Sequence, residues 1–97
     1  MVQIFKCTDT AQDVLDCVLA DGITGISGGR VSTRRLLNQV HELAEAAGHE
    51  RVIALSTYNH PETELAYIYD DEIYGPSQAK AKVIAEYDLM LANEAAD

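Results

Sequence analysis

Hydrophobic and polar positions follow two different periods along the first third of the chain. Val2 to Cys7 is a short run rich in strand-forming side chains, which predicts a strand. Apolar residues then recur at helical spacing, with Thr10 as a capping residue and Gly22 as a stop, so we predict a helix over residues 10–21. Ile23 to Ile26 can form a brief strand after that helix.

The rest of the pattern predicts a helix, a hairpin and a final helix. Ser32 is the expected cap of an amphipathic helix that ends at Gly48, and its apolar face holds Leu36, Leu37, Val40, Leu43, Ala44 and Ala47. Two strand-like runs, Arg51–Thr57 and Thr63–Tyr69, flank a turn and predict a β-hairpin. The last helix is expected from about Gln78 to Asn93, with a core stripe of Val83, Ile84, Tyr87, Met90 and Leu91.

These elements follow the order β-α-(β)-α-β-β-α. The chain has 97 residues, which is enough for one domain only, so we expect a single globular domain over residues 1–97. Apolar stripes on helices must be buried against apolar faces of strands. We therefore predict an α/β fold, with α+β as the alternative: a two-layer domain in which three helices pack against a small mixed sheet of three to four strands.

Composition places the chain among ordinary globular domains, because 47% of its residues are hydrophobic and 24% are charged. Its two cysteines, Cys7 and Cys17, are too few for a disulfide-rich secreted scaffold. The N-terminus lacks the basic and apolar regions of a signal peptide, and no apolar run is long enough to span a membrane. We therefore expect a reducing, intracellular and cytoplasmic setting.

Charge is distributed unevenly along the chain. Sixteen acidic and seven basic residues give a net charge of -9, and the whole excess lies after residue 35. A negative field repels nucleic-acid backbones and attracts basic surfaces. We therefore expect no direct binding to nucleic acid and no membrane contact, but a basic protein partner, with a nucleic-acid-binding protein or complex as one such partner.

The segment from Glu62 to Tyr74 is the first candidate binding surface. The residues that we expect to contact a partner protein are Glu62, Glu64, Tyr67, Tyr69, Asp70, Asp71, Glu72 and Tyr74. Acids on one face of a strand lie about 6.6–7 Å apart, close to the phosphate spacing of a nucleic-acid strand. Tyrosines add apolar area and a hydroxyl group at an interface. The alternative is that Tyr67 and Tyr69 belong to the core and the acids are merely solvated.

A smaller feature lies on the last helix. Leu89 is expected on the wet side, together with polar residues such as Lys82 and Glu86. With Ala85 and Ala92 it could form a contact with a partner or with a second copy of the chain, so a homodimer is possible. The alternative is a fully solvated helix face.

A glycine turn followed by a helix start is the second candidate site. Free backbone N–H groups at a helix N-terminus attract anions, and arginines in the first turn favour a compensating negative group. The residues concerned are Ser27, Gly28, Gly29, Arg30, Ser32, Arg34 and Arg35. A phosphate or other anion could supply that charge, and so could the carboxylates of the same chain.

The third candidate is a thiol site. Cys7 ends the first strand just before the first helix, and Cys7-Thr8-Asp9-Thr10 has the form C-x-x-T. In element order and in this motif the chain resembles thioredoxin-like and glutaredoxin-like proteins. The resemblance implies thiol chemistry at Cys7. The second cysteine of C-x-x-C is missing, and residues 49–51 lack the family's proline before the third strand.

No other motif indicates an enzyme. Gly25–Gly29 matches G-x-S-x-G, but that motif needs the sheet of a much larger hydrolase. His41, Glu45 and His49 lie four residues apart without forming H-E-x-x-H. We therefore predict no catalytic residue, no metal and no cofactor.

The leading hypothesis is a small acidic, non-enzymatic protein-binding module. In size, acidity and lack of motifs the chain resembles phage-encoded inhibitors of bacterial defence systems, anti-CRISPR proteins among them. The resemblance implies an inhibitor that docks its acidic, tyrosine-bearing hairpin on a basic protein surface as a nucleic-acid mimic. The alternatives are the anion-binding protein and the thiol protein described above.

Overall fold

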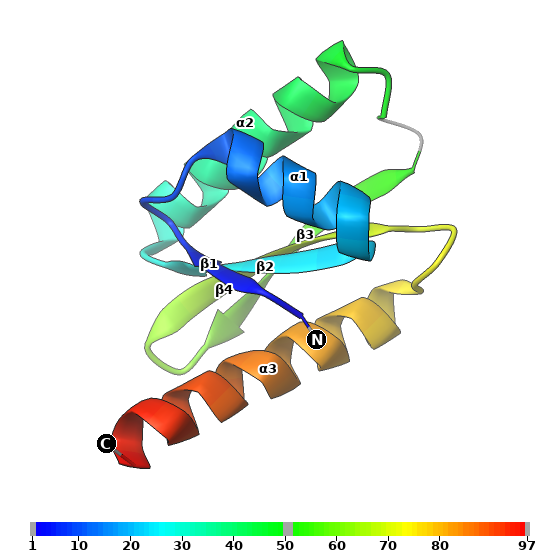
Figure 1. Cartoon of the computed structure of the whole chain (residues 1–97). Helices are drawn as coiled ribbons and strands as arrows, with labels where there is room; N and C mark the ends of the chain where they lie inside the picture. Colours follow the sequence, from blue (N-terminus) through cyan, green and yellow to red (C-terminus); the bar gives the residue numbers. More distant parts are fainter. Residues whose placement is uncertain (1, 50–51, 97) are drawn as a thin grey trace.

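The computed structural model describes residues 2–49 and 52–96. It contains the strands β1 (Ile4–Lys6), β2 (Ile23–Gly28), β3 (Ile53–His60) and β4 (Thr63–Asp70), and the helices α1 (Ala11–Asp21), α2 (Arg30–Ala46) and α3 (Pro76–Ala96) (Figure 1). The predicted α/β class and element order are confirmed. Arg51, the expected first residue of the third strand, lies outside the described residues.

The four strands form one mixed sheet in the order β1-β2-β4-β3. β1 pairs in parallel with β2, whereas β4 pairs antiparallel with both β2 and β3. β4 is therefore an inner strand with a hydrogen-bonded neighbour on each side. The brief strand expected near Ile23 is a full inner strand as well.

Helices cover both faces of this sheet (Figure 1). α1 and α2 pack on one face, where their apolar stripes meet Ile26, Ala66 and Ile68. α3 packs on the other face, against Ile23 and the odd-numbered residues Leu65, Tyr67 and Tyr69. The helix-on-sheet packing that the sequence predicts thus occurs twice, and the sheet lies between two helical layers.

Local chemistry explains where the first two helices begin and end. Thr10 caps α1, since its hydroxyl accepts the backbone N–H of Asp13, and Gly22 ends the helix with a left-handed φ of 79°. α2 starts earlier than predicted. Its N-cap is Gly29, which has no side chain to donate or accept, and not Ser32, which is already inside the helix.

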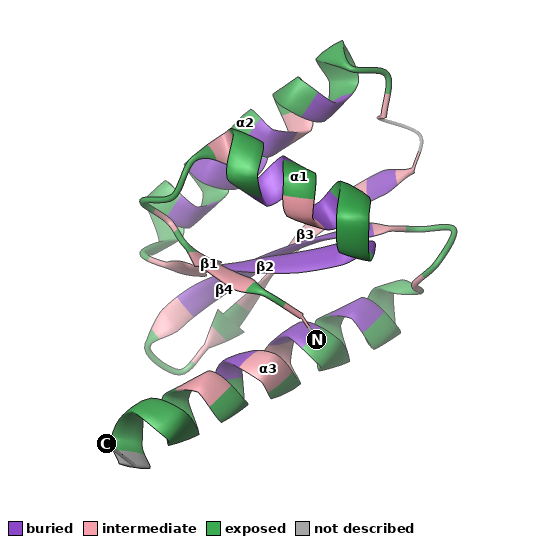
Figure 2. Ribbon diagram, in the orientation of Figure 1, coloured by how far each residue is buried: buried purple, intermediate pink, exposed green. Residues whose placement is uncertain are grey.

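Burial is greatest along β4, where the six residues from Glu64 to Tyr69 are all buried (Figure 2). The last turns of α3, in contrast, extend beyond the sheet and are exposed (Figures 1 and 2). Within the part of the chain that the structure describes, no helix combines the length and the apolar character needed to cross a membrane.

Candidate protein-binding groove

The tyrosines of the hairpin lie in the core. Tyr67 and Tyr69 are each only 5% exposed and stack on each other with ring centroids 6.0 Å apart, beneath α3. The inner position of β4, with strands on both sides and helices on both faces, forces this burial. The expectation that Tyr67 and Tyr69 face a partner is therefore corrected, and the core alternative is the one that the structure supports.

Glu64 is also buried, and it neutralises a predicted anion-binding arginine. Its carboxylate is 3% exposed and accepts hydrogen bonds from Nε and Nη2 of Arg34 at 3.0 and 2.9 Å. A carboxylate can be this deeply buried only with such a partner. The pair corrects two expectations, because neither Glu64 nor the bonded face of Arg34 is free for an external ligand.

The remaining acids of the hairpin lie at its two ends. Glu62 is exposed in the turn between β3 and β4, whereas Asp71 and Glu72 are exposed beyond the far end of β4. Eight strand residues at about 3.3 Å each separate these ends by about 25 Å. The expected row of carboxylates that would mimic phosphates is therefore not formed.

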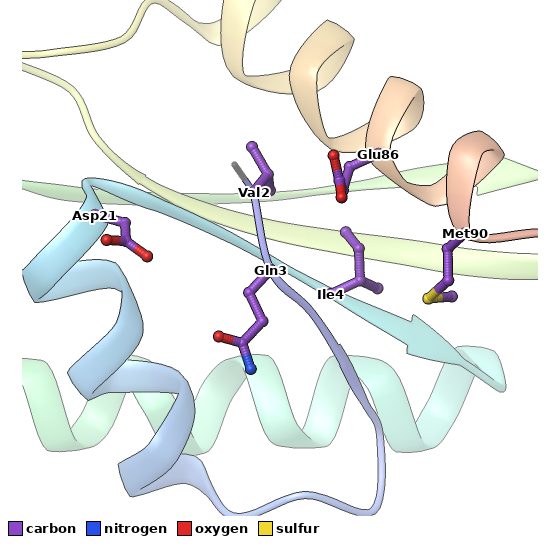
Figure 3. A pocket seen from close by; sticks show the side chains of 6 residues that line it. All are labelled: Val2, Gln3, Ile4, Asp21, Glu86 and Met90. Atoms are coloured by element: carbon purple, nitrogen blue, oxygen red, sulfur yellow. The ribbon is translucent and has the colours of Figure 1, made fainter. Parts of the chain in front are cut away.

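A groove lies instead at the β1 edge of the molecule. It consists of two surface hollows of about 360 and 620 Å3, both of which are lined by Val2, Asp21 and Glu86. Figure 3 shows the first hollow, with Val2 and Ile4 between Asp21 at the end of α1 and Glu86 and Met90 on α3. The groove thus joins three elements that are distant in the sequence.

The floor of the groove is apolar and its rim is mainly acidic. We call the larger apolar lining residues the floor: they are Val2, Ile4, Ile23, Tyr74, Leu89 and Met90. The rim is the set of charged lining residues: Asp21, Glu86 and a single cation, Lys82. Lys82 lies one turn before Glu86 on α3, and its Nζ is 5.9 Å from the ring centroid of Tyr74. Among the predicted binding residues, Tyr74 is the one that lines this groove.

The acidic turn after β4 lies next to the end of α1. The backbone N–H of Asp70 donates to the carbonyl oxygen of Gly22 at 2.9 Å, which holds the turn against the end of α1 and next to Asp21. Asp70 also has an internal role, since its carboxylate accepts the N–H of Glu72 at 2.9 Å. Asp71 and Glu72 remain exposed, and they add negative charge to this end of the molecule.

The glycine turn does not converge on an anion. Gly28, Gly29 and Arg30 line a shallow hollow, but the exposed Glu62 lines the same hollow and would repel a negative ligand. Ser32 and Arg35 are exposed further along α2, and Ser27 is half-buried in β2. The geometry therefore does not bring the predicted anion-binding residues together around one point.

Neither cysteine lies in the groove. Cys7 follows β1 as predicted and is half-buried, with its Sγ 2.5 Å from where a Cβ on Gly28 would stand. Burial raises the pKa of the Cys17 thiol, the nearby Asp21 carboxylate raises it further, and a hydrogen bond with Thr24 partly offsets both. The thiol of Cys17 is thus kept protonated. Across residues 2–49 and 52–96, no three His, Cys, Asp or Glu side chains gather closely enough to hold a metal.

Sequence reasoning missed most of the groove floor. Val2 and Ile4 belong to a predicted strand and Met90 to a predicted core stripe, so nothing in the pattern distinguished them from core residues. Leu89 and Ala85 gave the one available signal, because they are apolar residues on the face of the last helix that is otherwise polar. In the structure Leu89 is 52% exposed and lines the groove together with Ala85.

Comparison with known proteins adds nothing to this geometry, including for the thioredoxin-like resemblance. The chain matches no protein-family model, no curated protein and no solved structure at the similarity that we required.

Proposed function

We propose that this protein is a non-enzymatic protein-binding module whose groove takes a basic, amphipathic segment of a partner protein. The observation that carries the proposal is the apolar floor at the β1 edge with Asp21 and Glu86 on its rim. The proposal keeps the basic protein partner expected from the sequence and moves the contact from the hairpin to the groove.

Two properties of the groove determine what would fit it. Leu89 is 52% exposed and lines the groove, so a partner that covers it removes apolar surface from water. The acids on the rim and in the adjoining turn outnumber Lys82, and the whole chain carries a charge of -9. A segment with leucine-like side chains on one face and lysine or arginine on the other matches both properties.

The test uses an amphipathic helical peptide of leucine and lysine, titrated into the protein and followed by NMR. Backbone amide shifts are expected at Val2, Ile4, Tyr74 and Leu89, which line the groove. Leu89→Lys should weaken binding at least about tenfold, because it places a cation on the apolar floor. Val31→Lys is the matched control, since Val31 is 69% exposed on α2, outside the groove.

A second pair of variants tests the rim. Asp21→Asn combined with Glu86→Gln should slow association and reduce its salt dependence, because rim charges act mainly on the association rate. Glu62→Gln combined with Glu42→Gln removes the same charge at exposed positions that do not line the groove. This control pair should change the association rate and its salt dependence less. Equal effects of the two pairs, or shifts spread evenly over the chain, would show that the peptide follows net charge alone and would end the proposal.

An inhibitory role would follow if the partner's basic segment is one that otherwise binds nucleic acid. The two free thiols, Cys7 and Cys17, suit the reducing intracellular setting that this role requires. Competition between the protein and a nucleic acid for an identified partner would separate an inhibitor from a binding module of another kind.

A further inference from the structure

The outer side of β3 is a second surface with unused binding capacity. β3 is the last strand of the sheet order, and its eight residues, Ile53–His60, contain no charged side chain other than the titratable His60. Its register with β4 runs without interruption from Ile53↔Asp70 to His60↔Thr63, so no bulge twists the edge away. Native proteins usually protect such an edge with lysine, proline, a bulge or a short strand.

The direction of the backbone groups on this edge follows from the hydrogen bonds of β4. The N–H of Asp70 donates to Gly22, on the β2 side, so even-numbered residues of β4 bond to β2 and odd-numbered ones to β3. The register pairs those odd residues with even-numbered residues of β3, such as Tyr67 with Ser56. The N–H and C=O groups of Ile53, Leu55, Thr57 and Asn59 therefore point outward.

The opposite edge of the sheet is protected. β1 has only three residues, and Lys6 already uses both of its outward backbone groups. Its N–H donates to the Asp9 carboxylate at 2.8 Å, and its C=O accepts the N–H of Asp9 at 3.0 Å. Within residues 2–49 and 52–96, β3 is thus the one long edge that can accept another strand.

The geometry points to a second copy of this chain as the occupant: β3 pairs antiparallel with β3 of another copy about a two-fold axis at Ser56, and the two sheets become one. Outward groups must face each other, so odd residues pair with odd residues. An axis at Ser56 forms four such pairs inside the strand. Ile53 pairs with Asn59 and Leu55 pairs with Thr57, and the two-fold axis repeats both pairs. An axis at Leu55 or Thr57 forms three.

Charge also favours this edge for self-association. Two copies that each carry a charge of -9 repel over most of their surfaces. The charged groups of α3 that contact β3 are one of each sign: Lys80 Nζ lies 4.4 Å from the ring centroid of Tyr58, and Asp88 lies 2.9 Å from Nε2 of His60. The middle of the edge therefore carries no excess negative charge, so like-charged copies can approach there. Acids lie at its two ends, with Glu62 after His60 and Asp70 beside Ile53.

The first test is the oligomeric state by sedimentation equilibrium. The wild-type protein should be a dimer at micromolar concentration. Ser56→Lys and Ser56→Glu should each be monomeric, because like charges would meet across the axis at about 4.5 to 5.5 Å between Cβ atoms. An equimolar mixture of the two should restore the dimer. Circular dichroism of each variant checks that it remains folded, and Leu89→Lys, in the groove, should leave the dimer intact.

The second test fixes the register. In a variant without Cys7 and Cys17, Ser56→Cys should form a disulfide between copies under mild oxidation, because Ser56 faces itself at a Cα distance of about 4.5 Å. Ala54→Cys should not, because Ala54 faces Tyr58 of the other copy. A monomeric wild type, a dimer that survives both charged variants, or equal cross-linking at Ala54 and Ser56 overturns the proposal.

Discussion

The Glu64 carboxylate depends on one guanidinium group. It is 3% exposed, whereas the Arg34 side chain is 45% exposed, so loss of the arginine leaves a buried charge without its partner. Breaking a fully buried pair from one side costs about 3–5 kcal/mol, and the exposure of Arg34 lowers the expected cost here. We predict that Arg34→Met lowers the free energy of unfolding by about 2–3 kcal/mol in urea denaturation.

The double variant separates the pair from the packing of its side chains. Arg34→Met combined with Glu64→Met removes both charges and should be more stable than Arg34→Met alone, since no unpaired carboxylate is buried. If the free energy of unfolding of Arg34→Met stayed within about 0.5 kcal/mol of wild type, water would reach Glu64 and the ion pair would contribute little to stability.

Tyr69 couples stability to high pH. Burial raises the pKa of its hydroxyl, and the nearby Tyr67 and Asp71 raise it further. The unfolded chain therefore releases the Tyr69 proton first, near pH 10. The contribution of the protonated hydroxyl to the free energy of unfolding is complete below that pH, and it is lost as pH rises through the pKa of the folded state. We predict that Tyr69→Phe flattens the fall of the melting temperature above pH 10. Parallel curves for the two proteins would contradict the assignment.

At the scale of elements, local patterns predicted the strands and helices because hydrophobic periodicity is a local property. The order of strands is different, because it depends on pairing between distant segments. Residues Glu64 to Asp70 alternate between the two faces of the sheet, as in any strand. Both faces are buried, because β4 pairs with β2 inside the sheet and helices cover the sheet on both sides. No residue of the hairpin itself signals that pairing, so the exposed-tyrosine expectation and the core alternative could not be separated from sequence.

The contact between α3 and the sheet depends on the absence of a side chain at Gly25. A Cβ there would lie 2.7 Å from Cδ1 of Ile4 and 2.9 Å from Cγ1 of Val83, closer than van der Waals contact allows. We predict that Gly25→Ser destabilises the protein by about 2 kcal/mol or more, because α3 must move or the core must repack around a buried hydroxyl. Chemical denaturation measures the change.

Gly29→Ser is the matched control for that substitution. No atom lies within 4 Å of a Cβ at Gly29, and the residue is the N-cap of α2, where serine can accept a backbone N–H. Its effect should stay within about 0.5 kcal/mol of wild type or be stabilising. A similar loss of stability at both positions would remove the argument that α3 needs the glycine for close approach.

At the scale of the whole molecule, three distant segments build the groove. Val2, Asp21 and Glu86 come from the chain entering β1, the end of α1 and the middle of α3, and no short motif contains any two of them. The sequence therefore indicated that the chain is acidic and that Leu89 lies on an otherwise polar helix face. It did not indicate that Leu89 and acidic residues line the same groove. What brings them together is the parallel pairing of β1 with β2 and the packing of α3 on the opposite face.

The same net charge should act in opposite directions on the two proposed interfaces. A basic peptide is attracted to a chain of charge -9, so salt should weaken its binding at the groove, whereas two such chains repel, so salt should strengthen pairing at β3. We predict opposite signs of the salt dependence between about 20 and 300 mM sodium chloride, measured by peptide anisotropy and by sedimentation equilibrium. If salt weakened both, the dimer would be held by charge pairs rather than by a neutral strand edge. If salt strengthened both, the peptide would bind only through apolar contact and the acidic rim would have no role.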